Sequence, residues 1–188
     1  MWDLVILCFC GKTKTRLFPD YLNMNDIKIR RAVPEDLNEL RQLYYDTVTT
    51  INAKDYDENQ IRAWVAPWNN SDKPVRGEGK SFREKIVEQY FVAAVIDNTI
   101  AGFASVEDNG YLDFMYVHKD FQRRGIAKAL LTELENYAHQ KNIPELNAIV
   151  SKTALGFFEK HGWGKIREDV VEVRGAVFVD NIMIKKLK

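Results

Sequence analysis

The sequence predicts a single α/β (α+β) domain with a mixed, mostly antiparallel central sheet and helices on both faces. Three observations predict it. The chain has 188 residues, of which 46% are hydrophobic and 29% charged, which suits one domain with a substantial core and is too short for two large ones. Its hydrophobic spacing changes several times between the period of a strand and that of a helix. The resulting order is strand, helices, three strands, helix, strand, helix, two strands, which is typical of a layered domain with helices packed on a mixed sheet.

The first half of the chain opens with a strand and continues with helices. Residues 27–33 alternate apolar and polar side chains, as a half-buried strand does. Pro34 suits the first turn of a helix, because its missing N–H is not needed there. Asp57 and Gln60 have the spacing of a capping box at the start of a second helix. The elements expected here are a strand over 27–33, helices over 34–51, 57–67 and 82–89, and a loop over 68–80.

The second half contains most of the expected strands. The Asp97-Asn98 and Arg174-Gly175 pairs tolerate positive φ and predict two hairpins. A strongly amphipathic helix begins at Gly125, and Gly162 ends a later one. The expected strands span 90–96, 99–106, 111–118, 146–150, 165–173 and 177–184, and the expected helices span 125–142 and 153–161.

Charge and cysteine usage exclude several classes of protein. With 27 basic and 27 acidic residues, the chain lacks the diffuse positive field on which nucleic-acid and anionic-membrane binders rely, so neither partner is expected. Cys8 and Cys10 are too close in sequence for an unstrained bridge, so no disulfide framework is expected and a cytoplasmic location is favoured. His118, His139 and His161 have no metal-ligand spacing, and we expect no metal.

The N-terminal segment is interpreted as separate from the domain. The apolar run Leu4–Cys10 is far shorter than the roughly 20 residues that cross a bilayer, and a signal-peptide pattern is missing. We expect residues 1–23 to be an appendage and residues 24–188 to form the domain, with Met24 a candidate start. A docked additional strand is the competing interpretation.

The segment from Val117 to Lys128 carries the clearest chemical signal. A strand ends, a polar turn follows, and a helix starts at Gly125, where free backbone N–H groups and the helix dipole favour an anion. Glycine lets the backbone approach a ligand closely, and Ala127 is the next smallest choice. The basic residues of this segment are Lys119, Arg123, Arg124 and Lys128. Cations in a first turn oppose the helix dipole, so they favour a diphosphate site over a purely structural one.

At this point the sequence resembles a known family. Gln122-Arg123-Arg124-Gly125-Ile126-Ala127 is similar to the Gln/Arg-x-x-Gly-x-Gly/Ala signature of the GNAT superfamily of acetyl-CoA-dependent N-acetyltransferases. The segment from Ser151 to Trp163 resembles the second conserved block of that family, and the order of elements agrees over residues 27–187. Asp55, Tyr56, Gln60 and Trp64 look like the pattern of a bacterial branch.

The resemblance implies how the donor, acetyl-CoA, is held. The pantetheine arm would pair with the fourth strand where it separates from the fifth, and backbone N–H groups would bind the diphosphate. Ser151 stands where the family commonly has Asn, and Phe158 stands where a tyrosine often protonates the departing thiolate. The donor-binding residues implied are Met115, Tyr116, Val117, Gln122, Arg123, Arg124, Gly125, Ile126, Ala127, Lys128, Ser151 and Phe158.

Three residues are candidates for catalysis. A glutamate base is common in the family where this chain has Tyr111. Asp113 lies on the same side of the strand as Tyr111, and Glu107 lies just before the turn. A buried Asp113 requires a partner or a wet cleft. Tyr116 faces the opposite side unless a bulge intervenes.

The acceptor is expected to be an amine, of a small molecule or of a protein. Tyr56, Trp64 and Trp68 flank a loop and suit the wall of an acceptor pocket, although a small satellite core gives the same pattern. A homodimer is left open.

Two other classes of function compete with an N-acetyltransferase. A non-catalytic acyl-CoA sensor on the same fold is supported by the absence of a tyrosine at Phe158 and of a glutamate at Tyr111. A nucleic-acid-binding module could use the basic residues around Gly125, but zero net charge argues against it.

Overall fold

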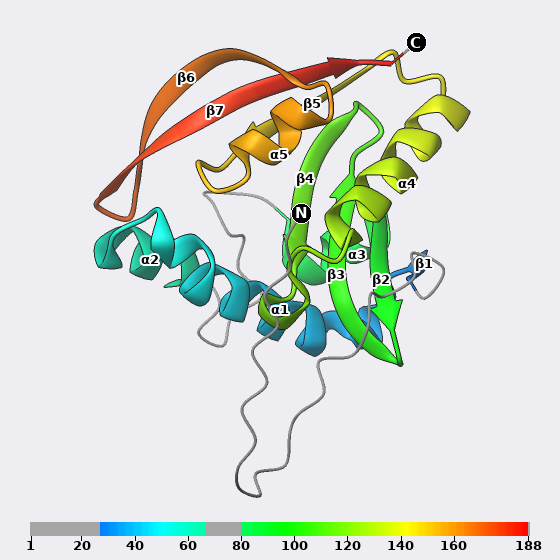
Figure 1. Ribbon diagram of the computed structural model, residues 1–188, viewed down its shortest axis with the longest axis horizontal. Helices are drawn as coiled ribbons and strands as arrows, with labels where there is room; N and C mark the ends of the chain where they lie inside the picture. Colours follow the sequence, from blue (N-terminus) through cyan, green and yellow to red (C-terminus); the bar gives the residue numbers. More distant parts are fainter. Residues whose placement is uncertain (1–26, 67–79, 188) are drawn as a thin grey trace, which may run out of the picture.

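The fold is a twisted seven-stranded sheet covered by helices on both faces, as the sequence predicts (Figure 1). The computed structural model describes residues 27–66 and 80–187. The strand order is β1-β2-β3-β4-β5-β7-β6, and only the β4–β5 pair is parallel. The strands are β1 (Lys28–Arg31), β2 (Tyr90–Ile96), β3 (Thr99–Val106), β4 (Tyr111–Val117), β5 (Glu145–Val150), β6 (Gly164–Val173) and β7 (Ala176–Lys186).

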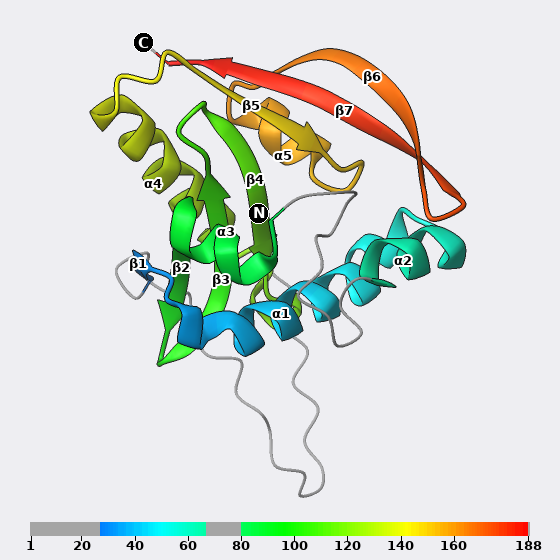
Figure 2. The same ribbon diagram turned by 180° about the vertical axis from the view of Figure 1, so that it is seen from behind.

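Helices lie on both sides of this sheet. One face carries α4, and the opposite face carries α1 and α3, which Figures 1 and 2 show from the two sides. The helices are α1 (Leu37–Thr50), α2 (Glu58–Val65), α3 (Phe82–Glu88), α4 (Ile126–Gln140) and α5 (Leu155–Lys160), with short 3-10 turns η2 (Pro34–Asp36), η3 (Asn52–Lys54) and η5 (Lys119–Phe121).

The buried side chains form two main clusters, one on each face of the sheet. Leu130 and Leu134 of α4 pack with Leu146 of β5 on one face. Leu40 of α1 packs with Phe103 of β3 on the other. Central strands buried on both faces explain why β2 and β3 are almost continuously apolar.

Local signals placed most elements within a few residues. The Asp57–Gln60 capping box is present, and Ser81 with Glu84 forms a second box that the sequence analysis missed. The helix expected from Pro34 begins instead as a 3-10 turn, and the strand β1 is more exposed than expected because it lies at the edge of the sheet. The expectations for residues 1–23, for Trp68 and for most of the 68–80 loop lie outside the described residues.

Candidate active site

A gap between β4 and β5 is the main feature of the candidate site. The two strands pair only at Tyr111 with Asn147 and at Leu112 with Ala148 in the described structure, whereas β4 pairs with β3 as far as Val117. His118 N donates to Ala101 O, which shows which backbone groups of β4 point toward β3. Since backbone groups alternate in direction along such a ladder, those of Met115 and Val117 point into the gap. An extended amide chain could therefore pair with β4 there.

The helix α4 begins at the open end of this gap. Gly125 is its N-cap at φ +83°, and Arg123 is also left-handed at φ +64°. A Cβ built on Gly125 would meet no other atom of the described residues within 4 Å, so the space before the helix is open. The first backbone N–H groups of α4 face a space that could hold an anion. We define residues 123–128, where the sequence predicts a diphosphate site, as the cradle.

Gly102 supports the cradle from beneath, which no local sequence pattern indicates. A Cβ on Gly102 of β3 would come within 2.8 Å of Ile126 Cγ2 and 2.9 Å of Tyr116 O. Only glycine therefore lets α4 begin so close to the sheet. The buried Ile126 then holds the first turn of α4 against the core.

The basic residues around the cradle are not equivalent. Arg123, Arg124 and Lys128 are exposed, and the Arg124 guanidinium lies 5.0 Å from the centre of the Phe121 ring. Lys119 is paired with Asp120 at 2.6 Å, which raises the pKa of Lys119 and lowers that of Asp120. Lys119 therefore carries its positive charge beside the cradle within an ion pair.

Gln122 connects the cradle to the end of β4. Its Nε2 donates to Val117 O at 2.7 Å and to His118 O at 3.2 Å. The same Val117 carbonyl accepts a hydrogen bond from Thr47 Oγ1 of α1 at 3.0 Å. In this structure Gln122, expected to bind the donor, fixes the turn that carries the cradle.

A bulge in β4 lies at the closed end of the gap. The β3–β4 register runs from Ser105 with Phe114 to Val106 with Leu112, so Asp113 is the additional residue. Leu112 belongs to the cluster under α4, whereas Phe114 packs with the cluster under α1. The bulge therefore brings Asp113 to the face occupied by Tyr116. Regular alternation along the strand would have placed the two on opposite faces.

Asp113 is bound by side chains of α3 and of the residue after it. Lys85 Nζ and Gln89 Nε2 each donate to Asp113 Oδ2 at 2.7 Å. Gln89 Nε2 also lies 3.1 Å from Glu107 Oε1, and Ser105 Oγ donates to Gln89 Oε1 at 2.7 Å. The Asp113 side chain is 12% exposed. The expectation that a buried Asp113 needs a partner is confirmed.

This network joins two of the three catalytic candidates. Gln89 bridges Asp113 and Glu107, and the third candidate, Tyr111, begins β4. Sequence reasoning missed Lys85 and Gln89, because no local pattern shows that α3 crosses over the bulge. Both donors end on Oδ2 of Asp113, and among the described residues no hydrogen bond reaches Oδ1.

Two of the three aromatic residues expected to line the acceptor pocket, Tyr56 and Trp64, form a satellite core. The Tyr56 and Trp64 rings lie 5.1 Å apart, edge to face, and both pack against Phe178 of β7. The Tyr56 hydroxyl accepts a hydrogen bond from Lys152 N at 2.8 Å. This packing matches the structural alternative that the sequence analysis left open.

The second block begins at the end of β5. Ser151 O accepts from Ala154 N, which starts the turn into α5. Phe158 is 4% exposed and meets the Trp163 ring edge to face at 4.9 Å. Phe158 thus serves as a core residue here.

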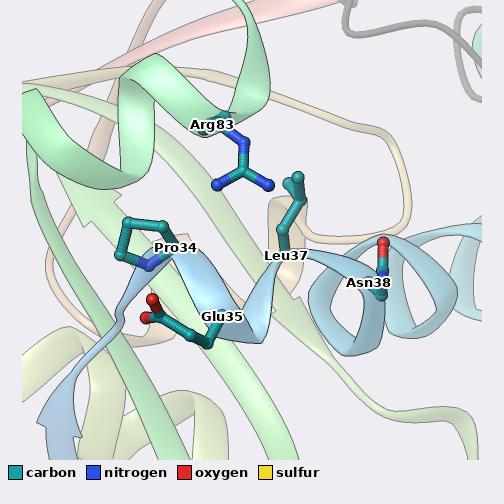
Figure 3. Close-up of a pocket in the computed structure, with 5 residues that line it drawn as sticks. All are labelled: Pro34, Glu35, Leu37, Asn38 and Arg83. Carbon is teal, nitrogen blue, oxygen red and sulfur yellow. The ribbon is translucent and has the colours of Figure 1, made fainter.

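A shallow hollow of about 390 Å³ lies elsewhere on the molecule. Figure 3 shows the guanidinium of Arg83 extending from α3 toward η2 and the start of α1. The lining residues are Pro34, Glu35, Leu37, Asn38 and Arg83. Leu37 lies ten residues before Thr47, about 15 Å along α1 at 1.5 Å per residue, so the hollow is remote from the cradle.

Comparison with known proteins agrees with this geometry. The family model for an acetyltransferase (GNAT) domain matches residues 52–186. The chain belongs to the GNAT acetyltransferase family. Like other GNAT proteins it is therefore an acyltransferase, and the predicted fold class is confirmed.

Individual GNAT relatives match most of the chain. It is 31% identical over 160 residues to the uncharacterized N-acetyltransferase YafP of Escherichia coli, covering 85% of this chain and 96% of YafP. A GCN5-related N-acetyltransferase structure from Rhodopseudomonas palustris superposes with a TM-score of 0.75 at 24% identity, over 89% of this chain and all of that one. The PaiA N-acetyltransferase of Thermoplasma acidophilum, solved in complex with coenzyme A, has a TM-score of 0.63 at 25% identity, over 86% and 99% of the two chains.

None of the helices described here is both long enough and apolar enough to span a membrane.

Proposed function

We propose that this GNAT protein transfers an acetyl group from acetyl-CoA to a primary amine by direct attack within a ternary complex. The observation that carries the proposal is the gap between β4 and β5, which opens onto the cradle at Gly125. A related structure contains coenzyme A, which supports acetyl-CoA as the donor.

The donor would be bound mainly by main-chain groups. The amides of the pantetheine arm would pair with Met115 and with the N–H of Val117 along the edge of β4, next to Tyr116, because the Val117 carbonyl already accepts from Thr47 and Gln122. Backbone N–H groups of residues 123–128 would bind the diphosphate, and Ser151 would border the arm from the β5 side. The open space at Gly125 fits this, since any side chain there would occupy the position of the phosphates.

The chemistry would take place at the bulge. The neutral amine attacks the thioester carbonyl carbon, the new C–N bond replaces the C–S bond, and CoA leaves as the thiolate. Asp113 would accept the amine proton at Oδ1, directly or through a water, while Lys85 and Gln89 hold Oδ2 in place. Glu107 and Tyr111 are the alternative proton acceptors.

The acceptor would approach on the face of α1 and α3. That face carries Asp113 and Tyr116, and it is opposite the helix α4 that binds the donor phosphates. Tyr56, Trp64 and Trp68 are proposed as the outer wall of this pocket. A cationic amine of a small molecule or of a protein suits the carboxylates at its base.

Two measurements test the proposal. Isothermal titration with acetyl-CoA should show saturable binding, and a thiol-release assay over a panel of amines should identify an acceptor. Absence of binding at millimolar acetyl-CoA would remove the proposed donor. Binding without thiol release over the whole panel would favour the acyl-CoA sensor instead, for which the core position of Phe158 is the supporting observation.

A further inference from the structure

One segment contacts both walls of the gap. We define the brace as Thr47, Asn52 and Tyr56, which lie on α1, on η3 and just after η3. On the β4 wall, Thr47 Oγ1 donates to Val117 O at 3.0 Å. On the other side, in the turn just after β5, Tyr56 OH accepts from Lys152 N at 2.8 Å, and Asn52 Nδ2 lies 3.4 Å from Thr153 Oγ1.

The brace is held firmly. Thr47 is 5% exposed and Asn52 is 6% exposed. If these bonds broke, their polar groups would be left buried without a hydrogen-bond partner, which costs free energy. The Tyr56 ring is fixed between Trp64 and Phe178, so its hydroxyl has a defined position. Figure 2 shows α1 and α2 passing from beneath β3 toward the tip of the β6–β7 hairpin.

The sheet alone cannot fix the width of the gap. The strands β4 and β5 share two residue pairs at its closed end, and on their other sides they belong to β3 and β7. Beyond Leu112 and Ala148, the described β5 has no ladder contact with β4. The spacing at the open end therefore depends on the core packed against both strands and on the hydrogen bonds that join Val117 to Lys152, and the brace supplies those bonds.

We propose that Thr47, Asn52 and Tyr56 are positioning residues that set the width of the gap to fit the pantetheine arm. The inference rests on the proposed function, because it takes the gap to be the pantetheine site. It gives Tyr56 a role beyond the acceptor wall. Because the brace is continuous with α1 and α2, it also connects the acceptor side of the site to the donor.

The test compares two ligands on the full chain by isothermal titration. CoA uses both gap and cradle, whereas its nucleotide part, 3′-phospho-ADP, lacks the pantetheine arm and uses the cradle alone. Tyr56→Phe removes the hydroxyl and keeps the ring, and Thr47→Val removes the hydroxyl and keeps the shape. Each should weaken CoA binding by about 5- to 10-fold, because a gap of altered width would lose about one hydrogen bond between the arm and β4, and leave nucleotide binding within about twofold.

Matched controls separate this effect from a loss of stability. Tyr137→Phe removes a hydroxyl that bonds Asp108, and Thr50→Val removes one that bonds Asp46 within α1. Neither should change CoA binding. Thr47→Ser keeps the hydroxyl and should bind CoA about as well as the unaltered protein does. This comparison remains possible if Thr47→Val unfolds at too low a temperature to be titrated.

Each outcome decides something different. If the unaltered protein binds no CoA, the proposed function fails and the brace fails with it. If it binds CoA and both brace variants bind CoA equally well, the brace is overturned while the donor site stands. If the variants lose CoA and nucleotide in parallel, the brace acts through general stability and the proposal is again overturned.

Discussion

The two ends of the gap are built differently. At the open end the cradle consists of main-chain groups at the start of α4, and its conformation depends on Gly125 at φ +83°. At the closed end the polar surface consists of side chains, with Asp113, Lys85 and Gln89 joined across the β4 bulge. One end presents a fixed backbone, and the other presents groups that can exchange protons.

The difference assigns a separate task to each end. Backbone N–H groups at a helix start have a fixed geometry and bind an anion without changing protonation. A carboxylate at the bulge can accept a proton, and its position depends on residues far apart in sequence. Changes at the cradle should therefore affect donor affinity, and changes at the bulge should affect turnover.

The largest expected effect is that of Asp113→Asn. The amide keeps the size of the carboxyl group and an oxygen that faces Lys85, but it cannot accept the amine proton. We expect kcat to fall by about 100-fold or more, with KM for acetyl-CoA within about twofold. Steady-state kinetics with a saturating amine measure both. Asp108→Asn, an exposed change on the preceding turn, is the control and should be silent. Unaltered kcat in Asp113→Asn would move the base to Glu107 or Tyr111.

A smaller effect with the opposite signature is expected at Gly125. Gly125→Val places a β-branched side chain at positive φ and in the space proposed for the diphosphate. KM for acetyl-CoA should rise by tens of fold, while kcat at saturating donor changes by less than about threefold. Gly175→Val is the matched control, because Gly175 also has positive φ (+78°) but lies at the tip of the β6–β7 hairpin. Equal KM values for the two variants would place the diphosphate elsewhere.

The same contrast explains which parts of the site the sequence could predict. The cradle follows from neighbouring residues: a strand end, a glycine and an amphipathic helix act within a few positions of one another. The Asp57–Gln60 capping box was predictable for the same reason. Such features need no knowledge of tertiary contacts.

The network at the bulge depends on contacts between distant segments. Gln89 reaches Asp113 across 24 positions, and Lys85 reaches it across 28. The bulge itself is a register shift between two strands, and a shift of one residue changes the face on which each side chain lies. The alternation of side chains within β4 could not predict whether a bulge is present. The contacts of the brace could not be predicted from the sequence either, because they join segments that are far apart in the chain.

Phe158→Tyr tests whether position 158 lies in the core or next to the departing thiolate, where a tyrosine could donate a proton. Phe158 is packed between Phe157 and Trp163, so an added hydroxyl would be buried. We expect a loss of about 1–3 kcal/mol in the free energy of unfolding, with kcat within about twofold. Thermal melting and steady-state kinetics measure the two quantities. A large rise in kcat would instead show that the ring borders the departing thiolate. Proton transfer would then take place at position 158 as well as at the bulge.

The smallest expected effect concerns the charge around the cradle. Arg124 is exposed and lies against the Phe121 ring, so its attraction for the donor phosphates is screened by salt. Arg124→Gln should raise KM for acetyl-CoA by about two- to fivefold at low salt, and the difference should disappear near 0.5 M salt, where the screening length falls to about 4 Å. Lys119→Gln is the control, since Lys119 is paired with Asp120 at 2.6 Å and should change KM less. Because the backbone groups of the cradle are not screened in this way, Gly125→Val should keep its high KM at both salt concentrations. A salt dependence shared by Arg124→Gln and Gly125→Val would mean that side-chain charge, and not the main chain, dominates donor binding.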